Sequence, residues 1–535
     1  MSGKVRLGIL IIIFLVAFGL RVYGSRVPFM DFSVDVVVVA RHISLIPGKM
    51  FLPLYGTYHG PFEPYLTRMS SVLFGNTTFG WRFMHVVLGA AMIFPIYGLA
   101  KEGFGETAGI FAAALIALNE IFIFLSKNML EDITYLFFAA LVLYFFFKAL
   151  KAEKARWMLA AAAAGALGFL AKETILFIAP GMFLYLLLTK RGRRWFIRPS
   201  LYLSIAVFFL ISSPYLYWTL THQFTDLKGN ALGYLHPFNF SGHTFDLFAG
   251  YYFPKIPGDI ESDLGWEYMG PVTGLVLLIG VFYTLRYMLR APHEKKELAR
   301  MLHLCFWGVV AISLFLFQGV PRHFAVAILP AASLASIPIT QIWQWQGRKG
   351  AKTLVVGALA VMLVFSSYAT YKFKEYWLVS SATGLGDLGG KGWADGTTIS
   401  QGLIKVAREE EATLAVFSAS LEEVGLFFSA YSGIPVISES PFYFWLKYSE
   451  DSQKRIIVFL DSSLGVRYFR KWAAENGYCL SGPLVREFHA KRKFRGKDET
   501  FNFDIKILIM DKTETTREPD LKEIVRFLRG ELEQY

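Results

Sequence analysis

The stretch EDITYLFFAALVLYFFFKALK, residues 131–151, shows the character of the first two thirds of the chain. It opens with two acids, runs through fifteen uncharged and mostly apolar residues, and closes on two lysines. A membrane-spanning helix needs about 20 predominantly apolar residues, with a range near 17–25. The segment from 132 to 148 therefore predicts a transmembrane helix with charge at both ends.

Ten further stretches have the same apolar character. They cover residues 7–23, 81–100, 107–125, 157–171, 174–189, 200–220, 269–289, 301–318, 324–345 and 352–371. Only Lys172-Glu173 separates the stretch that ends at 171 from the one that begins at 174, which predicts a tight helical hairpin with a charged tip. We therefore expect a polytopic α-helical membrane protein with about 11 transmembrane helices.

Composition excludes most other classes of protein. The chain has 535 residues, of which 54% are hydrophobic and 18% charged, against roughly 25% charged in soluble domains. So few charges could not cover the three or four soluble domains that this length would otherwise suggest. The same composition excludes an intrinsically disordered chain and a disulfide scaffold.

The net charge of +12 reflects the distribution of basic residues between the spans. If the N-terminus is cytoplasmic, most of the lysines and arginines between spans fall on the cytoplasmic side. The short outside loops hold only Lys127, Lys172 and Arg322. This asymmetry follows the positive-inside rule, so we expect the membrane bilayer, and no nucleic acid, as a partner. An odd number of spans then places the C-terminal portion outside.

The first apolar stretch has two interpretations. Lys4 and Arg6 before an apolar run are typical of a signal peptide. Arg21-Val22-Tyr23 follows in place of a small-residue cleavage site, so we favour an uncleaved first helix. The two cysteines, Cys305 and Cys479, lie in a predicted span and in the C-terminal portion, and they show neither disulfide nor metal spacing.

These patterns predict a membrane domain over residues 1–371, a linker over 372–396 and an extracytoplasmic α/β domain over 397–535. The membrane domain includes an outer juxtamembrane segment, 24–80, and an outer loop, 221–268. In the C-terminal domain, short apolar runs predict strands and amphipathic stretches predict helices. The strands are Thr413–Ser418, Arg455–Leu460 and Asp504–Met510, and the helices are Ser420–Tyr431, Leu464–Asn476 and Asp520–Glu533.

Ionisable residues gather where the topology predicts the outer membrane face. Charges in or beside spans are costly, so they are candidates for a functional site. The candidates are Asp31 and Asp35, His59 and Glu63, Asp132, Lys172, and Arg322 with His323. All lie on the same predicted side, where they could line one pocket.

Each candidate also has a simpler explanation. Asp31 and Asp35 could be solvated, and Asp132 could cap a span with help from the helix dipole. Lys172 could be an interfacial lysine that reaches water, or Glu173 could neutralise it. His59 and Glu63 could be surface contacts, and Arg322-His323 an interfacial anchor. The signal is the joint occurrence of these residues on one face.

At this point the sequence resembles the GT-C glycosyltransferases that use polyprenyl-phosphate sugars, the branch with protein O-mannosyltransferases and aminoarabinose transferases. Asp31 with Ala40-Arg41-His42 is similar to the acidic first outer loop and Ala-Arg-rich helix of the family. The stretch Tyr55–Leu66 resembles its Gly-x-x-Tyr-x-Gly-x-x-Glu-x-Tyr-Leu pattern. Further motifs match at Asp132, at Leu170-Ala171-Lys172 and at Arg322-His323 with Pro330.

The chain departs from the family pattern at three positions. Phe32 follows Asp31 where relatives often have Glu, which leaves open whether Asp31 or Asp35 is equivalent. Glu173 stands where relatives usually have Gly, and His323 replaces a Tyr. The resemblance covers residues 1–345.

The resemblance implies a glycosyltransferase that moves a sugar from a polyprenyl-phosphate-linked donor to an extracytoplasmic protein, lipid or polysaccharide. Asp31 or Asp35 would be the catalytic base, and Lys172 and Arg322 would bind the donor phosphate. His59, Glu63, Asp132 and His323 would bind substrate. Since cations stabilise the leaving phosphate, no obligatory metal or other cofactor is expected. The alternatives are a secondary transporter and a non-catalytic assembly protein that binds a lipid carrier.

Overall fold

The computed structural model describes most of the helical part of the chain and a smaller share of the C-terminal part. The described residues are 3–23, 25, 60–75, 78–128, 131–221, 270–290, 293–315, 321–345, 349–380, 396–417, 428, 432, 434, 436–438, 455–460, 470, 478–494 and 497–512. They form two compact units, of which the first ends at Lys374 and the second begins at Glu375. Each unit is described separately below.

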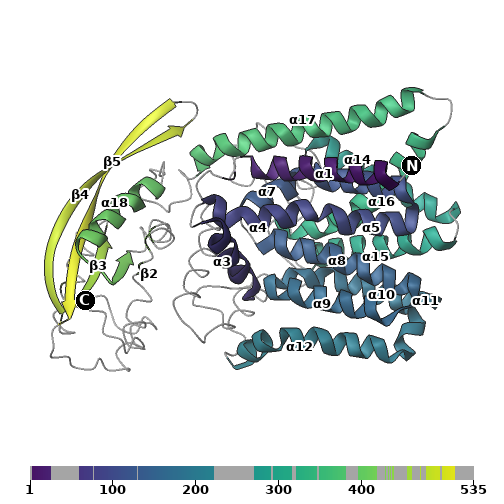
Figure 1. Cartoon of the computed structure of the whole chain (residues 1–535), viewed down its shortest axis with the longest axis horizontal. Helices are drawn as coiled ribbons and strands as arrows, with labels where there is room; N and C mark the ends of the chain where they lie inside the picture. The colour runs from purple at the N-terminus through teal and green to yellow at the C-terminus, as the bar shows by residue number, and fades with distance from the viewer. Residues whose placement is uncertain are drawn as a thin grey trace. The chain divides into compact units, whose positions relative to one another are not determined.

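The first unit is a bundle of helices that lie side by side, with their long axes running in a common direction (Figure 1). Its α-helices are α1 (Gly3–Val22), α3 (Phe62–Phe74), α4 (Thr78–Ala91), α5 (Ile93–Phe104), α6 (Glu106–Ala117), α7 (Glu120–Asn128), α8 (Glu131–Ala152), α9 (Ala155–Ala171), α10 (Ala179–Leu188), α11 (Lys190–Arg193), α12 (Pro199–Thr221), α14 (Pro271–Arg290), α15 (His293–Phe315), α16 (Ile328–Gln344) and α17 (Lys349–Ser380). Within the described residues, 3-10 helices occur at η1 (Glu173–Ile178), η2 (Arg194–Ile197) and η5 (Pro321–Ala327).

Length and composition make this unit a membrane domain. Six helices among the described residues are long and apolar enough to cross a bilayer, or eight if two bent pairs each count as one span. The pairs bend by 51° between Ala117 and Glu120 and by 92° between Leu188 and Lys190. Every apolar stretch predicted from the sequence overlaps a described helix, so the polytopic helical class is confirmed.

The helices differ in how deeply they lie in the bundle. In α8 and α16, 72% and 83% of the membrane-crossing segment is buried inside the protein, against 17% in α1, α12 and α17. Figure 1 accordingly shows α12 and α17 at opposite margins of the bundle. We infer that α8 and α16 are central, whereas α1, α12 and α17 present most of their surface to lipid.

The bend between α6 and α7 has an identifiable cause. The Asn119 side chain accepts a hydrogen bond from the backbone N–H of Phe122 at 3.1 Å, and so starts a new helix at Glu120. The break frees carbonyl groups at the end of α6. The Arg21 guanidinium at the end of α1 donates to two of them, Ala117 O at 3.0 Å and Ile116 O at 3.2 Å.

The second unit contains a five-stranded sheet in the order β2-β1-β3-β5-β4. The strands are β1 (Leu414–Phe417), β2 (Val436–Ser438), β3 (Arg455–Leu460), β4 (Tyr478–Phe494) and β5 (Lys497–Lys512). β1 pairs in parallel with β2 and β3, whereas β5 pairs antiparallel with β3 and β4. Helix α18 (Gly396–Glu409) lies against the sheet (Figure 1), and Leu403 and Ala407 join Phe417, Phe459 and Ile507 in the core.

The sequence predicted some of these elements. The strand Arg455–Leu460 is confirmed to the residue, and strands also occur at the other two predicted places. The long strand β4 was not predicted, because its basic second half lacks an apolar alternation. Helix α17 continues to Ser380, past the predicted boundary at residue 371. The helices predicted at 420–431, 464–476 and 520–533 lie almost wholly outside the described residues.

Candidate active site

Lys172 and Asp132 form a buried ion pair at one end of the membrane bundle, which we call the Lys172 end. The Lys172 Nζ donates to both carboxylate oxygens of Asp132, at 3.0 Å each. Their side chains are 4% and 0% exposed. The sequence predicted that these two residues, 40 positions apart in the chain, line one pocket, and they are in contact. A buried charge pair at the end of a membrane span is a candidate for a functional site.

The local fold explains where Lys172 points. Its backbone is extended, with φ −160° and ψ 133°, so α9 ends and η1 begins at the next residue. The Lys172 N–H still donates to Gly168 O at 2.8 Å. Gly168 allows this tight turn because a Cβ there would lie 2.2 Å from Ile175 and 2.9 Å from Phe138. Asp132 lies in the first turn of α8, where the helix dipole favours a carboxylate.

This geometry excludes two simpler roles for Lys172. A lysine whose amine is buried against a carboxylate is not reaching for water at the interface. Glu173 is not its counter-ion either, because the Glu173 carboxylate accepts a hydrogen bond from Tyr215 of α12 at 2.6 Å. The two charges at the hairpin tip thus engage different neighbours, Asp132 of α8 and Tyr215 of α12.

The segment from Gly60 to Glu63 packs beside the hairpin. A Cβ on Gly60 would lie only 2.2 Å from the Leu170 carbonyl oxygen, so the backbone of Gly60 lies directly against the end of α9. The Phe62 ring meets Phe138 of α8 edge to face, with centroids 5.6 Å apart. Glu63 is fully buried and pairs with His85 of α4, so the interpretation of Glu63 as a surface contact is wrong.

The other predicted site residues are placed only in part. The backbone of η5, which carries Arg322 and His323, contacts η1, α7 and α8. Both residues therefore belong to an element beside the Lys172–Asp132 pair. Asp31, Asp35 and His59 lie outside the described residues. Their predicted roles stay predictions.

Sequence reasoning missed two buried ionisable residues at the same end, Arg82 and His85. Arg82 donates to Ser25 O at 3.0 Å, and both residues are fully buried, as is Lys127, which the sequence placed in an outer loop. Arg82 and His85 lie inside the predicted span 81–100, so an ionisable residue within an apolar stretch was the available signal. Nothing in the sequence marks Tyr215 as the partner of Glu173.

Metal ligands do not cluster in the described part of the chain. No three His, Cys, Asp or Glu side chains come together there as a metal site would require. Asp31, Asp35 and His59 are outside the described residues, so this search does not include them. That no metal is obligatory therefore stays a prediction.

Comparisons with known proteins support the resemblance. Residues 58–218 match the family model of dolichyl-phosphate-mannose-protein mannosyltransferases. No curated protein matches the sequence. The matched segment holds Gly60, Glu63, Asp132, Lys172 and Tyr215, which are the residues that build the described site.

The fold is similar to that of solved membrane glycosyltransferases. The apo structure of ArnT from Cupriavidus metallidurans matches with a TM-score of 0.59 and 13% identity over 95% of this chain and 97% of that one. The structure of the same enzyme bound to undecaprenyl phosphate matches with a TM-score of 0.56 and 13% identity, over 97% of this chain and 100% of that one. The Archaeoglobus fulgidus oligosaccharyltransferase in complex with Zn and sulfate matches with a TM-score of 0.52 and 15% identity, over 89% of this chain and 72% of that one.

The structural matches establish the fold, and the family model ties the segment that carries the site to a glycosyltransferase family. The family model covers residues 58–218, and the structural match extends over 95% of the chain. Residues 58–218 include the buried Lys172–Asp132 pair. Over residues 58–218 the chain therefore matches a glycosyltransferase family, and its fold is similar to that of solved membrane glycosyltransferases.

Proposed function

We propose that this enzyme transfers a sugar from a polyprenyl-phosphate-linked donor to an acceptor on the extracytoplasmic side of the membrane. The observation that carries the proposal is the buried Lys172–Asp132 pair at the α9–η1 hairpin, with η5 alongside. Undecaprenyl phosphate bound to ArnT, a protein of similar fold, supports a lipid-phosphate donor. The acceptor is a protein, a lipid or a polysaccharide.

The leaving group of this reaction is a phosphate, which needs positive charge more than it needs a proton. A lysine ammonium has three N–H donors, and two point to the oxygens of Asp132. The third can meet a donor phosphate oxygen without breaking the pair. Such a preorganised cation, shielded from water, stabilises developing charge far better than a solvated one. Arg322, on the neighbouring η5, would add a bidentate contact.

The chemical step is a single displacement. An acceptor hydroxyl or amine attacks the anomeric carbon, the bond from that carbon to the phosphate oxygen breaks, and the electron pair leaves with the phosphate. The acceptor proton passes to a carboxylate, Asp31 or its rival Asp35. The anomeric configuration is inverted. His59, Glu63 and His323 are proposed to shape the sugar or acceptor site, with Glu63 acting through His85.

Topology completes the proposal. We assign eleven spans, a cytoplasmic N-terminus, and a cell membrane location with the Lys172 end facing outward. Lysine and arginine residues gather at the opposite end, as the positive-inside rule requires. The second unit would then form a small extracytoplasmic α/β domain over residues 397–535. We propose that no divalent metal is obligatory.

The test is sugar transfer in liposomes from a panel of polyprenyl-phosphate sugars. Lys172→Ala should weaken donor binding and lower kcat about 100- to 1,000-fold, as loss of one preorganised donor does elsewhere. Lys154→Ala is the matched control, because Lys154 precedes the first residue of α9 as Lys172 follows its last. Unimpaired donor binding in Lys172→Ala would overturn the phosphate role. Asp31→Asn and Asp35→Asn that both retain activity would overturn the base assignment.

A further inference from the structure

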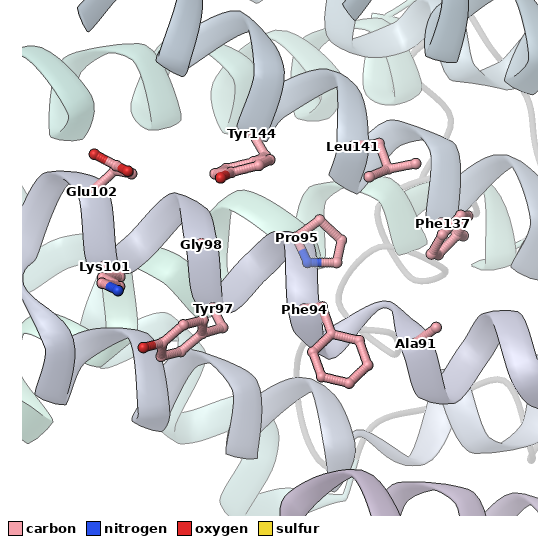
Figure 2. Close-up of a pocket in the computed structure, with 10 residues that line it drawn as sticks. All are labelled: Ala91, Phe94, Pro95, Tyr97, Gly98, Lys101, Glu102, Phe137, Leu141 and Tyr144. Carbon is pink, nitrogen blue, oxygen red and sulfur yellow. The ribbon is translucent and has the colours of Figure 1, made fainter. Parts of the chain in front are cut away.

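A second ligand site is suggested by an open groove between α5 and α8. It encloses about 420 Å³, within the range of roughly 300–1,000 Å³ for small-molecule pockets. Its lining comes from the end of α4 and from the facing sides of α5 and α8: Ala91, Phe94, Pro95, Tyr97, Gly98, Lys101, Glu102, Phe137, Leu141 and Tyr144. Figure 2 shows the lining sorted by polarity along the groove.

One end of the groove is apolar. Ala91, Phe94, Phe137 and Leu141 lie together at this end (Figure 2). Phe94 is 46% exposed although it belongs to a membrane-crossing helix. An apolar hollow that opens on the side of a membrane helix pair faces lipid chains rather than water, so an acyl chain is its natural occupant.

The other end of the groove is polar and positively charged. Lys101 lies there with Tyr97, Glu102 and Tyr144 (Figure 2). The Tyr144 hydroxyl accepts a hydrogen bond from Lys148 at 2.9 Å. Lys101 lines the groove, whereas Lys148 is not part of the lining and adjoins it through Tyr144. Both lysines are only partly buried. Their ammonium groups lie over the rings of Trp157 and Tyr97, at 4.1 and 5.5 Å from the centroids.

The carboxylates near this end are already paired. Glu102 accepts from Lys151 at 2.8 Å, and Glu106 accepts from Arg6. Within the described residues, neither Lys101 nor Lys148 forms an ion pair with a carboxylate. The polar end therefore carries net positive charge, held on cations that are oriented by aromatic rings.

We propose that this groove binds one acyl chain of an anionic phospholipid, with the lipid phosphate between Lys101 and Lys148. The apolar end and the cationic end match the two parts of such a lipid. Basic pockets between membrane helices on the cytoplasmic side are known to bind anionic head groups. The occupant would be a diacyl phospholipid of the cytoplasmic leaflet.

This site is separate from the proposed active site. Asp132 lies in the first turn of α8, and Tyr144 follows it by twelve residues, or about 18 Å at 1.5 Å per residue. Lys148 lies one turn further still. The lipid site therefore stands or falls independently of the transfer reaction, and none of its lining residues contacts Lys172 or Asp132 in the described contacts.

The experiment is native mass spectrometry of the purified full chain with phosphatidylglycerol and with phosphatidylcholine of identical acyl chains. We expect tighter binding of phosphatidylglycerol. The double variant Lys101→Gln with Lys148→Gln should lower that affinity about 25- to 30-fold, since each cation near a membrane surface contributes about fivefold. Leu141→Trp should fill the apolar end and weaken both lipids.

Lys154→Gln is the control, because it removes an exposed cation that has no described hydrogen bond to a lining residue, whereas Lys148 donates to Tyr144. An equal loss in Lys154→Gln would mean that surface charge alone attracts the lipid, and would overturn the proposal. So would equal binding of the two lipids, or competition by inorganic phosphate alone. A melting temperature unchanged in the lysine variants shows that the fold is intact, and sugar transfer then reports separately on the active site.

Discussion

The two ends of the membrane bundle hold their charges in opposite ways. At the Lys172 end, Lys172–Asp132 and Glu63–His85 are buried pairs. At the opposite end, which we call the Lys151 end, the pairs Arg6–Glu106, Lys151–Glu102 and Arg198–Glu153 have side chains that are 30–42% exposed. Burial distinguishes these two sets of pairs, although the Lys151 end also holds one buried carboxylate, Glu297, which accepts a hydrogen bond from Tyr185 and pairs with Arg300.

Exposed and buried ion pairs contribute differently to the free energy of unfolding. An exposed ion pair contributes about 0–1 kcal/mol and is screened by salt. A buried pair often gives no net stabilisation, because desolvation cancels the attraction, yet breaking it costs about 3–5 kcal/mol. Because the buried pairs at the Lys172 end add little net stability, we infer that they are present for the transfer reaction. The exposed basic residues at the Lys151 end instead set the orientation of the helices in the membrane.

The largest effect should follow from breaking the Lys172–Asp132 pair. Asp132→Leu leaves the buried Lys172 amine without this carboxylate, so we expect a loss of about 3–5 kcal/mol in unfolding free energy. Thermal unfolding in detergent measures it. The double variant Asp132→Leu with Lys172→Met should regain most of that stability and yet remain inactive in sugar transfer. A double variant that stays as unstable as the single one would contradict this account.

A smaller effect is expected for the Glu63–His85 pair. His85→Ala leaves the fully buried Glu63 carboxylate without this partner, at a cost of about 3 kcal/mol. The cost is at the low end for a buried pair because the imidazole can be neutral. His85→Gln, which keeps a hydrogen-bond donor, should restore part of the stability in the same unfolding assay. Equal losses in both variants would indicate packing rather than the bond.

The close approach of Gly60 to α9 predicts an intermediate effect. In Gly60→Ala the new methyl group meets the Leu170 carbonyl, so we expect a loss of about 2 kcal/mol from overpacking. The hairpin that carries Lys172 would shift with it, which should raise KM for the donor. Gly8→Ala is the control, because no atom lies within 4 Å of a Cβ at that position in α1. A Gly60→Ala variant that behaves like Gly8→Ala would show that the contact relaxes freely.

The same contrast explains how much the sequence could predict. Apolar length determines a membrane helix almost alone, so α8 was predicted within four residues at each end. The order of spans also placed Asp132, Lys172 and the η5 residues on one face. Such predictions need only the order of crossings. The described residues bring Asp132 and Lys172 together, whereas the count of eleven spans stays a prediction.

Side-chain direction could not be predicted in the same way. Asp132 is 40 residues from Lys172, whereas Glu173 is its neighbour in sequence. The extended backbone at Lys172 separates the two, so the neighbour engages Tyr215 and the distant acid becomes the ion-pair partner. The burial of Glu63 could not be predicted for a related reason, because the position of α3 depends on the backbone contact at Gly60.

The smallest effect is expected at the Lys151 end, for Glu153 between α8 and α9. A hydrogen bond from Arg198 holds the pKa of this carboxylate below its ordinary value. A lowered folded-state pKa gives stability that is present above the unfolded pKa of about 4.3 and is lost as pH falls through the folded value. Glu153→Gln should therefore cost less than 1 kcal/mol near pH 7, because the pair is exposed.

The pH and salt dependence of Glu153→Gln separate this pair from the buried ones. Gln has the same backbone penalty as Glu at φ 52°, so the comparison isolates the charge. The deficit of Glu153→Gln in melting temperature should shrink as pH falls below about 4, through the lowered pKa of Glu153. It should also shrink in 0.5 M salt, where the Debye length falls to about 4 Å. The deficit of Asp132→Leu should persist in salt, since water and ions do not reach Lys172. If salt abolished both deficits equally, burial would not distinguish the two ends of the bundle.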